Sequence, residues 1–344
     1  MGVNCILALV DFELAKLDIW NYKDDYLQTQ QLKNLDTELK RSYTAVYHIY
    51  KNKLVQLGAD DAETITIVNE GNADWVLAES NKGNRVEGQW NGRTKSTACI
   101  INSNTGQRKI IYQNQQINAT PSPAGKFVYW YNVAQKNYFT YEVATGITSN
   151  ISGSVKVALY DEENDVPDLP NNYGVMGWQD GDSALYVYDR FNIWSLHPLN
   201  TATSKLLFAD NKRQSGNILR YINTDKEHRS FSSAKPYLFS GFNRNNKQSG
   251  LFISAIPNAN TFNEIMYEKQ SATSRHLLSK NNQALAFSIE SYGMAPDIYY
   301  YNISEAFKIP VIDSMGNLVG GVSNSITRLS NINPQQNNYN WGTA

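Results

Sequence analysis

The chain has 344 residues, a formal net charge of -1, and 18% charged against 41% hydrophobic residues. This balance excludes a disordered chain, and the scattered Lys and Arg form no basic stripe, so we expect no nucleic-acid partner. No apolar run approaches the ~18 residues that a membrane-crossing helix needs, so we expect no membrane span.

The first ten residues, Met1 to Val10, are apolar but contain no basic residue. The acidic residues Asp11 and Glu13 follow at once. A secretory signal begins with a basic region, so this pattern predicts a strand and not a signal peptide.

The next segment, Asp24 to Arg41, is polar and contains neither Gly nor Pro. Leucines recur in it at near-helical intervals, at Leu27, Leu32, Leu35 and Leu39. This spacing predicts a short helical insertion. Such a helix either covers the edge of the fold or docks another domain.

One short motif recurs along the chain: a polar residue or glycine, an aliphatic residue and an aromatic residue. It occurs at Asp18-Ile19-Trp20, Asn137-Tyr138-Phe139, Asn192-Ile193-Trp194, Gly250-Leu251-Phe252 and Asp297-Ile298-Tyr299, with a tyrosine in the aliphatic position of the second copy. The last four copies begin 55, 58 and 47 residues apart, and a second strand-like run precedes each of them. The chain also holds 22 Tyr, 12 Phe and 7 Trp, which favour strands.

Each repeat therefore predicts a meander of three or four short antiparallel strands. The predicted units cover residues 4–57, 64–113, 117–151, 174–209, 217–268 and 273–312. A single meander cannot bury both of its faces, whereas meanders stacked around an axis bury one another. A sandwich would also contain many short strands, but it needs no repeat of ~50 residues. We predict an all-β fold, a β-propeller of roughly five to six blades with one helical insertion.

Several stretches carry a family resemblance. Ser122 to Trp130 (SPAGKFVYW) resembles the Ser-Pro-Asp-Gly-Lys strand opening of propellers in prolyl-oligopeptidase-family serine peptidases, an opening that Tol-type propellers share. Ala124 stands where the family has Asp. Three longer stretches resemble a branch of large Bacteroidetes-type peptidases of this family. They are Leu17 to Leu32 (LDIWNYKDDYLQTQQL), Tyr160 to Trp178 (YDEENDVPDLPNNYGVMGW) and Asn333 to Ala344 (NPQQNNYNWGTA).

This resemblance implies a chain without catalytic residues of its own. The family carries its Ser-His-Asp triad on an α/β-hydrolase domain, with the serine in a Gly-x-Ser-x-Gly elbow that this sequence lacks. We therefore expect no catalytic residue, and an inactive chain whose full-length parent is a serine peptidase. The expected domains are an incomplete seven- or eight-bladed propeller at 1–330 and a linker at 331–344 leading to the hydrolase domain.

The resemblance also implies partners and a compartment. The expected partners are that hydrolase domain and peptide substrates, and the parent enzyme is expected in the periplasm or outside the cell. The alternative is a stand-alone Tol-type propeller that acts as a protein-binding scaffold. An independent propeller enzyme, such as a glycosidase, would need two facing carboxylates, and no such pair is recognisable in the sequence.

The densest acidic cluster supplies the candidate binding residues. It spans residues 161–168 (DEENDVPD) and contains Glu162 and Glu163. It is interpreted as a solvated loop between blades, as a cation site, or as a substrate contact. Dipeptidyl-peptidase relatives hold the amino terminus of the substrate with a Glu-Glu pair, which Glu162 and Glu163 resemble. Arg190, at a predicted turn, either binds a peptide carbonyl or carboxylate, or pairs locally with Asp189 or an acid of another blade.

The remaining residue types predict no cofactor. Cys5 and Cys99 are expected to be two buried free thiols, and neither has a metal-ligand spacing, so we expect no metal site. Five of the tryptophans fall mostly at strand positions and are expected to pack between blades: Trp20, Trp130, Trp178, Trp194 and Trp341.

Overall fold

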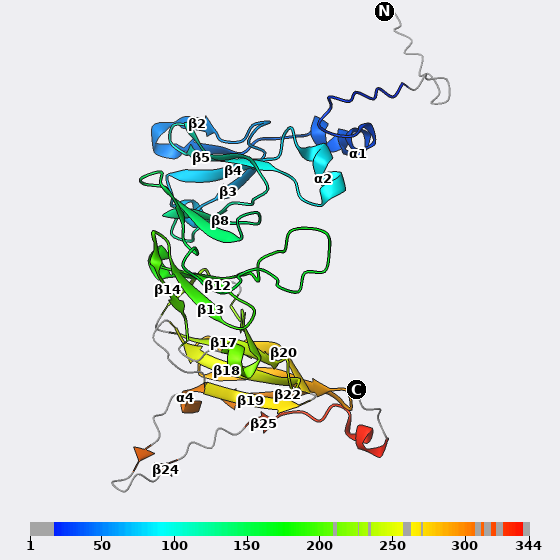
Figure 1. Cartoon of the computed structure of the whole chain (residues 1–344), viewed down its shortest axis with the longest axis vertical. Helices are drawn as coiled ribbons and strands as arrows, with labels where there is room; N and C mark the ends of the chain where they lie inside the picture. The colour runs from blue at the N-terminus through cyan, green and yellow to red at the C-terminus, as the bar shows by residue number, and fades with distance from the viewer. Residues whose placement is uncertain are drawn as a thin grey trace, which may run out of the picture. The chain divides into compact units, whose positions relative to one another are not determined.

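A computed structural model describes residues 17–208, 212–225, 227–232, 235–256, 263–269, 271–306, 311–312, 318–320 and 326–339. The predicted strand at Met1–Val10, with Cys5, and Trp341 lie outside these described residues. The chain divides into two compact units, residues 1–67 with 74–117, and residues 68–73 with 118–344. Each unit is considered by itself below (Figure 1).

The first unit holds one four-stranded sheet and a hairpin. The hairpin consists of β1 (Ala45–His48) and β2 (Lys53–Gln56), joined by the 3-10 turn η2 (Ile49–Lys51). The sheet runs in chain order through β3 (Thr64–Ile67), β4 (Trp75–Ser80), β5 (Ser96–Asn102) and β6 (Arg108–Gln115), and all its pairings are antiparallel. Two helices accompany it, α1 (Gln28–Leu39) and α2 (Arg85–Asn91).

The first sheet of the second unit contains β7 (Thr120–Pro121), β8 (Phe127–Asn132), β9 (Asn137–Glu142) and β10 (Thr148–Asn150). The second contains β11 (Val175–Gln179), β12 (Leu185–Tyr188), β13 (Ile193–His197) and β14 (Asn200–Leu206), with β16 (Ser230–Phe231) added in parallel beside β11. The third contains β15 (Asn217–Ile222), β17 (Pro236–Asn243), β18 (Gln248–Ala255) and β19 (Asn263–Lys269).

The fourth sheet contains β20 (Ser271–Leu278), β21 (Ala284–Ser291), β22 (Met294–Asn302) and β25 (Thr327–Arg328). A short hairpin joins β23 (Val311–Ile312) and β24 (Leu318–Gly320). The unit also contains short helical turns: η3 (Asn69–Gly71), η4 (Asp180–Asp182), α3 (Lys212–Ser215), α4 (Ile303–Ala306) and η5 (Pro334–Asn338).

The sheets of the second unit stack face to face, as Figure 1 shows in the succession of β8, β12, β17 and β22. Strand β12 is buried on both sides. Its residues Leu185 and Val187 pack with the β8–β9 sheet, while Tyr186 and Tyr188 pack with the β17 sheet. In the same way, Leu238 of β17 faces the β21–β22 sheet. Since successive side chains of a strand point to opposite faces, the second and third sheets each separate two hydrophobic cores.

The fold is therefore an all-β propeller, and the prediction is confirmed. The described residues contain five sheets of four or five strands, which correspond to the predicted units from 64–113 onward. The predicted unit 4–57 differs, because its described part holds α1 and the two-stranded hairpin of β1 and β2. Aromatic residues dominate the core between the second and third sheets, where the rings of Tyr186, Tyr221 and Tyr237 surround Phe231 at centroid distances of 4.9 to 5.7 Å. Such edge-to-face contacts are favoured by the charge distribution of the rings.

The predicted helix is confirmed, with narrower bounds than the predicted segment Asp24 to Arg41. It begins at Gln28 because Asp25 is held outside it, where its carboxylate accepts hydrogen bonds from the backbone N–H of Gly83 at 2.8 Å and of Arg85 at 3.1 Å. No residue of α1 is buried. Its leucine stripe, Leu32, Leu35 and Leu39, is 62%, 48% and 76% exposed.

The tryptophans differ in how far they are buried. Trp130 and Trp178 are buried as expected and Trp194 is partly buried, but Trp20 is 65% exposed, so the expectation of packing is wrong for that residue. Trp20 precedes the first helix and belongs to no described strand, and a motif triplet outside a strand has no neighbouring sheet to cover it. Cys99 is a buried free thiol.

The predicted linker at 331–344 is described as far as Tyr339. Gln336 of η5 is buried, and its side-chain oxygen accepts a hydrogen bond from the backbone N–H of Ala295 at 2.7 Å. Asp297 of β22 accepts hydrogen bonds from the Ser330 hydroxyl at 2.8 Å and the Ile332 backbone N–H at 2.9 Å. The backbone hydrogen bond from Ile332, followed by those of Ser330 and Arg328, lowers the pKa of Asp297. This segment is tied to the fourth sheet.

Candidate functional site

The acidic cluster lies on the loop that connects β10 to β11. The loop closes on itself, since the backbone N–H of Asp161 donates to the Asn171 carbonyl at 2.8 Å and that of Tyr173 donates to the Leu159 carbonyl at 3.0 Å. Inside the loop, the Asn164 side-chain amide donates to the carbonyls of Val166 at 3.0 Å and Asp168 at 2.9 Å. These bonds give the loop a defined shape of its own.

The loop brings Glu163 to two arginines of different sheets. One of its carboxylate oxygens, Oε1, forms ion pairs with Arg190 and with Arg244, the latter at 2.9 Å. Arg190 lies in the β12–β13 turn and Arg244 in the β17–β18 turn. Glu163 therefore links the second and third sheets through charged groups.

The neighbouring Glu162 faces a third arginine. Its carboxylate lies 3.8 Å from the Nη2 atom of Arg213, in α3. The ring of Phe191 lies beneath the guanidinium groups, 5.1 Å from that of Arg213 and 5.7 Å from that of Arg190. We call Glu162, Glu163, Arg190, Arg213 and Arg244 the charged cluster.

The turn that carries Arg190 is fixed by Asp189. This residue is fully buried, and its carboxylate accepts hydrogen bonds from the backbone N–H of Phe191 at 2.6 Å and of Asn192 at 2.7 Å. It also accepts one from the indole N–H of Trp194 at 2.9 Å. Of the two ion-pair partners expected for Arg190, the Asp189 carboxylate instead binds this turn, and Arg190 pairs with an acid from outside its own turn, Glu163 of the β10–β11 loop.

A further arginine binds the backbone of the same turn. Arg220, in β15, donates to the carbonyl oxygens of Asp189 at 3.4 Å and Arg190 at 3.3 Å, and its guanidinium lies 4.6 Å from the ring centre of Tyr188. Burial lowers the pKa of Arg220, although an arginine remains protonated at physiological pH. The backbone of Arg190 is thus held on both sides.

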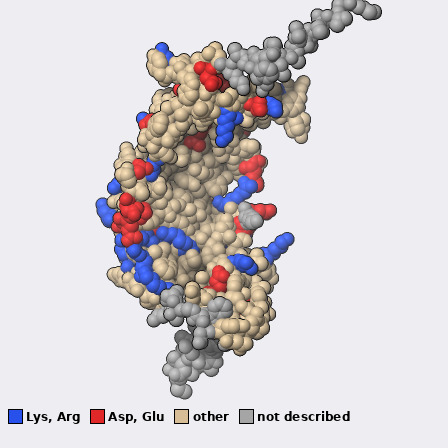
Figure 2. Space-filling model, turned by 90° about the vertical axis from the view of Figure 1, so that its right-hand side faces the viewer, with Lys and Arg blue, Asp and Glu red and all other residues tan. Residues whose placement is uncertain are grey.

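The electrostatics favour an ionised Glu163. Hydrogen bonds from Arg190 and then from Arg244 lower the pKa of its carboxyl group. The carboxyl is therefore charged at neutral pH, although its side chain is 57% exposed. Figure 2 shows acidic and basic side chains lying beside one another on the face drawn there.

Sequence reasoning missed Arg213 and Arg244. A signal for Arg244 exists, because an aromatic-Asx-Arg triplet occurs at Tyr188-Asp189-Arg190 and again at Phe242-Asn243-Arg244. The buried Asn243 accepts from the backbone N–H groups of two following residues at 2.9 and 3.1 Å, as Asp189 does in its own turn. Both arginines occupy the turn between the second and third main strands of their sheets. Arg213 has no comparable signal, since it lies in an irregular connection.

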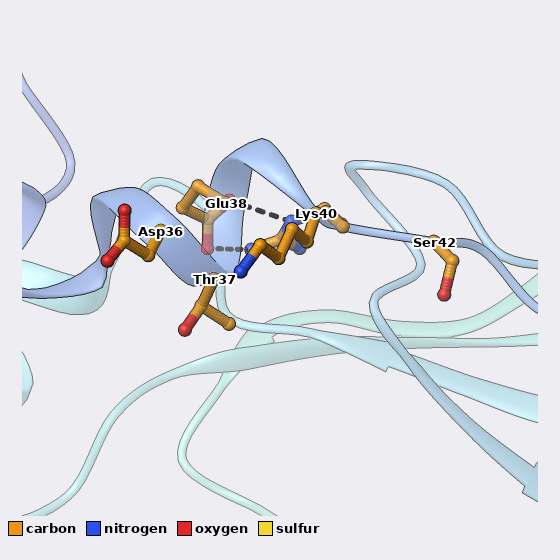
Figure 3. Close-up of a pocket in the computed structure, with 6 residues that line it drawn as sticks. Asp36, Thr37, Glu38, Lys40 and Ser42 are labelled. Carbon is orange, nitrogen blue, oxygen red and sulfur yellow. Dashed lines mark hydrogen bonds and ion pairs between the residues drawn. The ribbon is translucent and has the colours of Figure 1, made fainter.

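The first unit contains two open pockets beside α1. One, of about 510 Å³, is lined by Asp36, Thr37, Glu38, Lys40, Arg41 and Ser42, and Figure 3 shows these side chains around the end of the helix. The other, of about 480 Å³, shares Glu38 and Arg41 with it and extends to Arg85. Arg85 bonds Asp25 at 2.6 Å and Glu63 at 2.5 Å, so it ties the start of α1 to the sheet. The acidic and basic side chains beside α1 thus pair with one another.

The described residues offer neither a metal centre nor a membrane-spanning helix. No group of three His, Cys, Asp or Glu side chains is placed to hold a metal ion there. None of the helices in that part of the chain combines the length and the hydropathy needed to cross a bilayer.

Comparison with known proteins gives a fold likeness only. No family model and no curated protein matches the sequence. Among solved structures, a prolyl endopeptidase matches with TM-score 0.41 and 11% identity over 71% of this chain and 35% of its own. A protein described as a dipeptidyl aminopeptidase IV from Bacteroides ovatus matches with TM-score 0.44 and 11% identity, over 77% of this chain and 45% of its own.

TolB from Acinetobacter baumannii matches with TM-score 0.32 and 12% identity, over 84% of this chain and 65% of its own. This chain thus spans less than half the length of the two peptidases. At these identities and scores the matches describe similar architecture, and the assignment of function depends on the residues of the chain itself.

Proposed function

We propose that this chain is a non-catalytic propeller of a prolyl-oligopeptidase-type serine peptidase, which admits and positions peptides for a separate α/β-hydrolase domain. The peptide contacts would be made by Glu162, Glu163 and Arg190. The parent enzyme would act in the periplasm or outside the cell.

The charged cluster is the observation that carries this proposal. A peptide has a positively charged amino terminus and a negatively charged carboxyl terminus, and the cluster presents groups of both signs within one site. Arg190 is held by a hydrogen-bonded turn within its own blade, to which Asp189 and Arg220 contribute. Pre-organised charges of this kind bind a ligand without the cost of ordering them.

The sequence resemblance supports the peptidase assignment. The stretch of Asn333 to Ala344 resembles the segment that precedes the hydrolase domain in the family. Within the described part of that stretch, Gln336 is bound to the last sheet. A chain leaving a propeller toward a second domain would need a fixed point of this kind.

The test is an activity and binding assay on the purified chain. Fluorogenic peptides should show no turnover that a serine-reactive phosphonate abolishes, while unlabelled peptides should bind with measurable affinity. Phosphonate-sensitive turnover, or no binding of any peptide, would refute the proposal. The reading frame after codon 344 gives a second test, since the proposal expects a hydrolase with a Gly-x-Ser-x-Gly elbow.

A second candidate is a Tol-type protein-binding scaffold. The exposed leucine stripe of α1 favours it, because an amphipathic helix with a free apolar face can dock a partner protein. A stop codon after Ala344 together with the absence of peptide binding would favour this candidate.

A further inference from the structure

Resting on the proposed function, we propose that Arg190, Arg213 and Arg244 form a carboxylate-binding site for the peptide, and that Glu163 occupies this site when no peptide is bound. The ligand group is a carboxylate, either the carboxyl terminus or an acidic side chain. The loop of residues 160–173 then acts as an internal competitor.

The geometry of the ion pairs supports this inference. Glu163 meets Arg190 and Arg244 through a single oxygen, Oε1, and through one Nη2 atom of each guanidinium. A guanidinium carries five N–H donors in a planar fork and binds a carboxylate best with two parallel hydrogen bonds. The arrangement with Glu163 therefore uses a small part of what the two arginines can donate, and a carboxylate that approaches squarely can gain more.

The balance of charge points the same way. Three guanidinium groups meet two carboxylates in the cluster, and the second contact, between Glu162 and Arg213, is 3.8 Å long. This distance exceeds that of a hydrogen bond, so the two groups attract each other without a direct bond. Among the five side chains of the charged cluster, the cations therefore outnumber the anions by one.

The hydrogen bonds inside the loop do not depend on the ion pairs of Glu163. These bonds, such as that from Asp161 N–H to the Asn171 carbonyl at 2.8 Å, lie inside the loop and are kept when Glu163 leaves the arginines. The arginine side is fixed instead by buried groups of the blades, Asp189 for Arg190 and Asn243 for Arg244. Exposed ion pairs contribute little to stability, so a carboxylate ligand can displace Glu163 at low cost.

The loop also resembles the ligand that it would replace. Its sequence, Asp161 to Asp168 (DEENDVPD), is an acidic segment that contains a proline. An internal competitor lowers the apparent affinity of the ligand by the fraction of molecules in which the site is open. Removal of the competing charge should therefore strengthen the binding of a carboxylate peptide relative to that of the matching amide peptide.

The experiment compares three peptides on the 344-residue chain by fluorescence anisotropy, with a dansyl group, which carries no carboxylate, on an internal lysine. All have the same alanine-proline sequence: one ends in a free carboxylate, one in an amide, and one in an amide with an internal glutamate. The variants are Glu163→Gln, which removes the competing charge, and Arg244→Gln, which removes a binding cation. Asp165→Asn is the matched control, because it removes an exposed charge from the same loop.

Glu163→Gln should bind a carboxylate peptide at least about tenfold more tightly than the unmodified chain, and Asp165→Asn should not differ from that chain. Arg244→Gln should weaken the same peptide about tenfold and should leave the amide peptide unaffected. Tight binding of the free carboxylate alone identifies the carboxyl terminus as the ligand, and tight binding of the glutamate peptide identifies an acidic side chain.

Two results overturn the inference. If Glu163→Gln binds the carboxylate and plain amide peptides equally, the arginines do not select a carboxylate, while peptide binding by the propeller stands. If no peptide binds to the unmodified chain or to Glu163→Gln, the proposed function fails together with the inference.

Discussion

At the scale of single residues, a carboxylate supplied by the neighbouring blade replaces one that the sequence lacks. The Ser122-to-Lys126 turn has Ala124 where the resembling family has Asp. In the structure, the buried Asp182 of the next sheet accepts hydrogen bonds from Ser122 Oγ at 2.5 Å and from the backbone N–H of Ala124 and Lys126, both at 3.0 Å. The turn therefore keeps its carboxylate partner, which now also links two blades.

This arrangement predicts that restoring the family residue is harmful. Ala124→Asp should lower the free energy of unfolding by about 2 kcal/mol, because it brings a second carboxylate beside the buried Asp182. Ala124→Asn, of similar size without the charge, should have a smaller effect. Urea denaturation followed by fluorescence measures both.

A double variant provides the control for the same prediction. Ala124→Asp combined with Asp182→Asn removes the repulsion and should recover part of the stability lost in Ala124→Asp. Equal stability of Ala124→Asp and the natural chain would show that the two side chains do not interact.

At the scale of elements, two facing glycines leave room for an aromatic ring on one face of the third sheet of the second unit. Gly241 of β17 lies opposite Gly250 of β18, and a Cβ at either position would fall 2.4 to 2.5 Å from the ring of Phe252. Carbon atoms do not approach that closely without a shift. The two glycines thus leave space for the ring of Phe252, which packs against the core between the second and third sheets.

Gly241→Ala should therefore cost about 1–3 kcal/mol of stability, because the methyl group forces the Phe252 ring to move. Gly241→Ala with Phe252→Leu should cost less than the sum of the two single changes, since the smaller side chain makes room. Thermal unfolding of the four proteins measures the coupling. As a control, Gly153→Ala should cost little, since its nearest neighbour, the Asn150 side chain, lies at 3.4 Å. Additive effects would contradict the close approach.

At the scale of the second unit, stability is expected to follow nearest-neighbour packing of its sheets. Leu185 of β12 is fully buried in the core toward β8 and β9, and Leu285 of β21 is fully buried in the core toward β17 and β18. The two cores share no residue. In stacked repeats, each unit is stabilised mainly by its own fold and its two neighbours.

Leu185→Ala and Leu285→Ala should each destabilise the protein by about 2–5 kcal/mol, through lost burial and a cavity. Hydrogen exchange should separate them: the first change should speed exchange most in β8, β9 and β12, and the second most in β18, β21 and β22. The same exchange pattern for both variants would indicate that the sheets open as one block and would contradict this prediction.

The sequence by itself determined five of the six predicted units and their order, from 64–113 onward. Strands follow from aromatic and β-branched alternation, and turns follow from Asn, Asp and Gly, because both depend on residues a few positions apart. The helix near residues 28–39 was predicted for the same reason. The pair of Glu162 and Glu163 and the turn arginine Arg190 were recognised as candidates from their residue types.

Only the tertiary structure decided which residues meet. Glu163 contacts Arg244 across 81 positions of sequence, and Asp182 binds the turn of Ser122 across 60. Such contacts depend on how neighbouring sheets are stacked and turned, which local patterns do not specify. For the same physical reason Trp178 is buried and Trp20 is exposed, although both are large aromatic residues: Trp178 lies on β11 and packs in the core toward β8 and β9, whereas Trp20 belongs to no described strand.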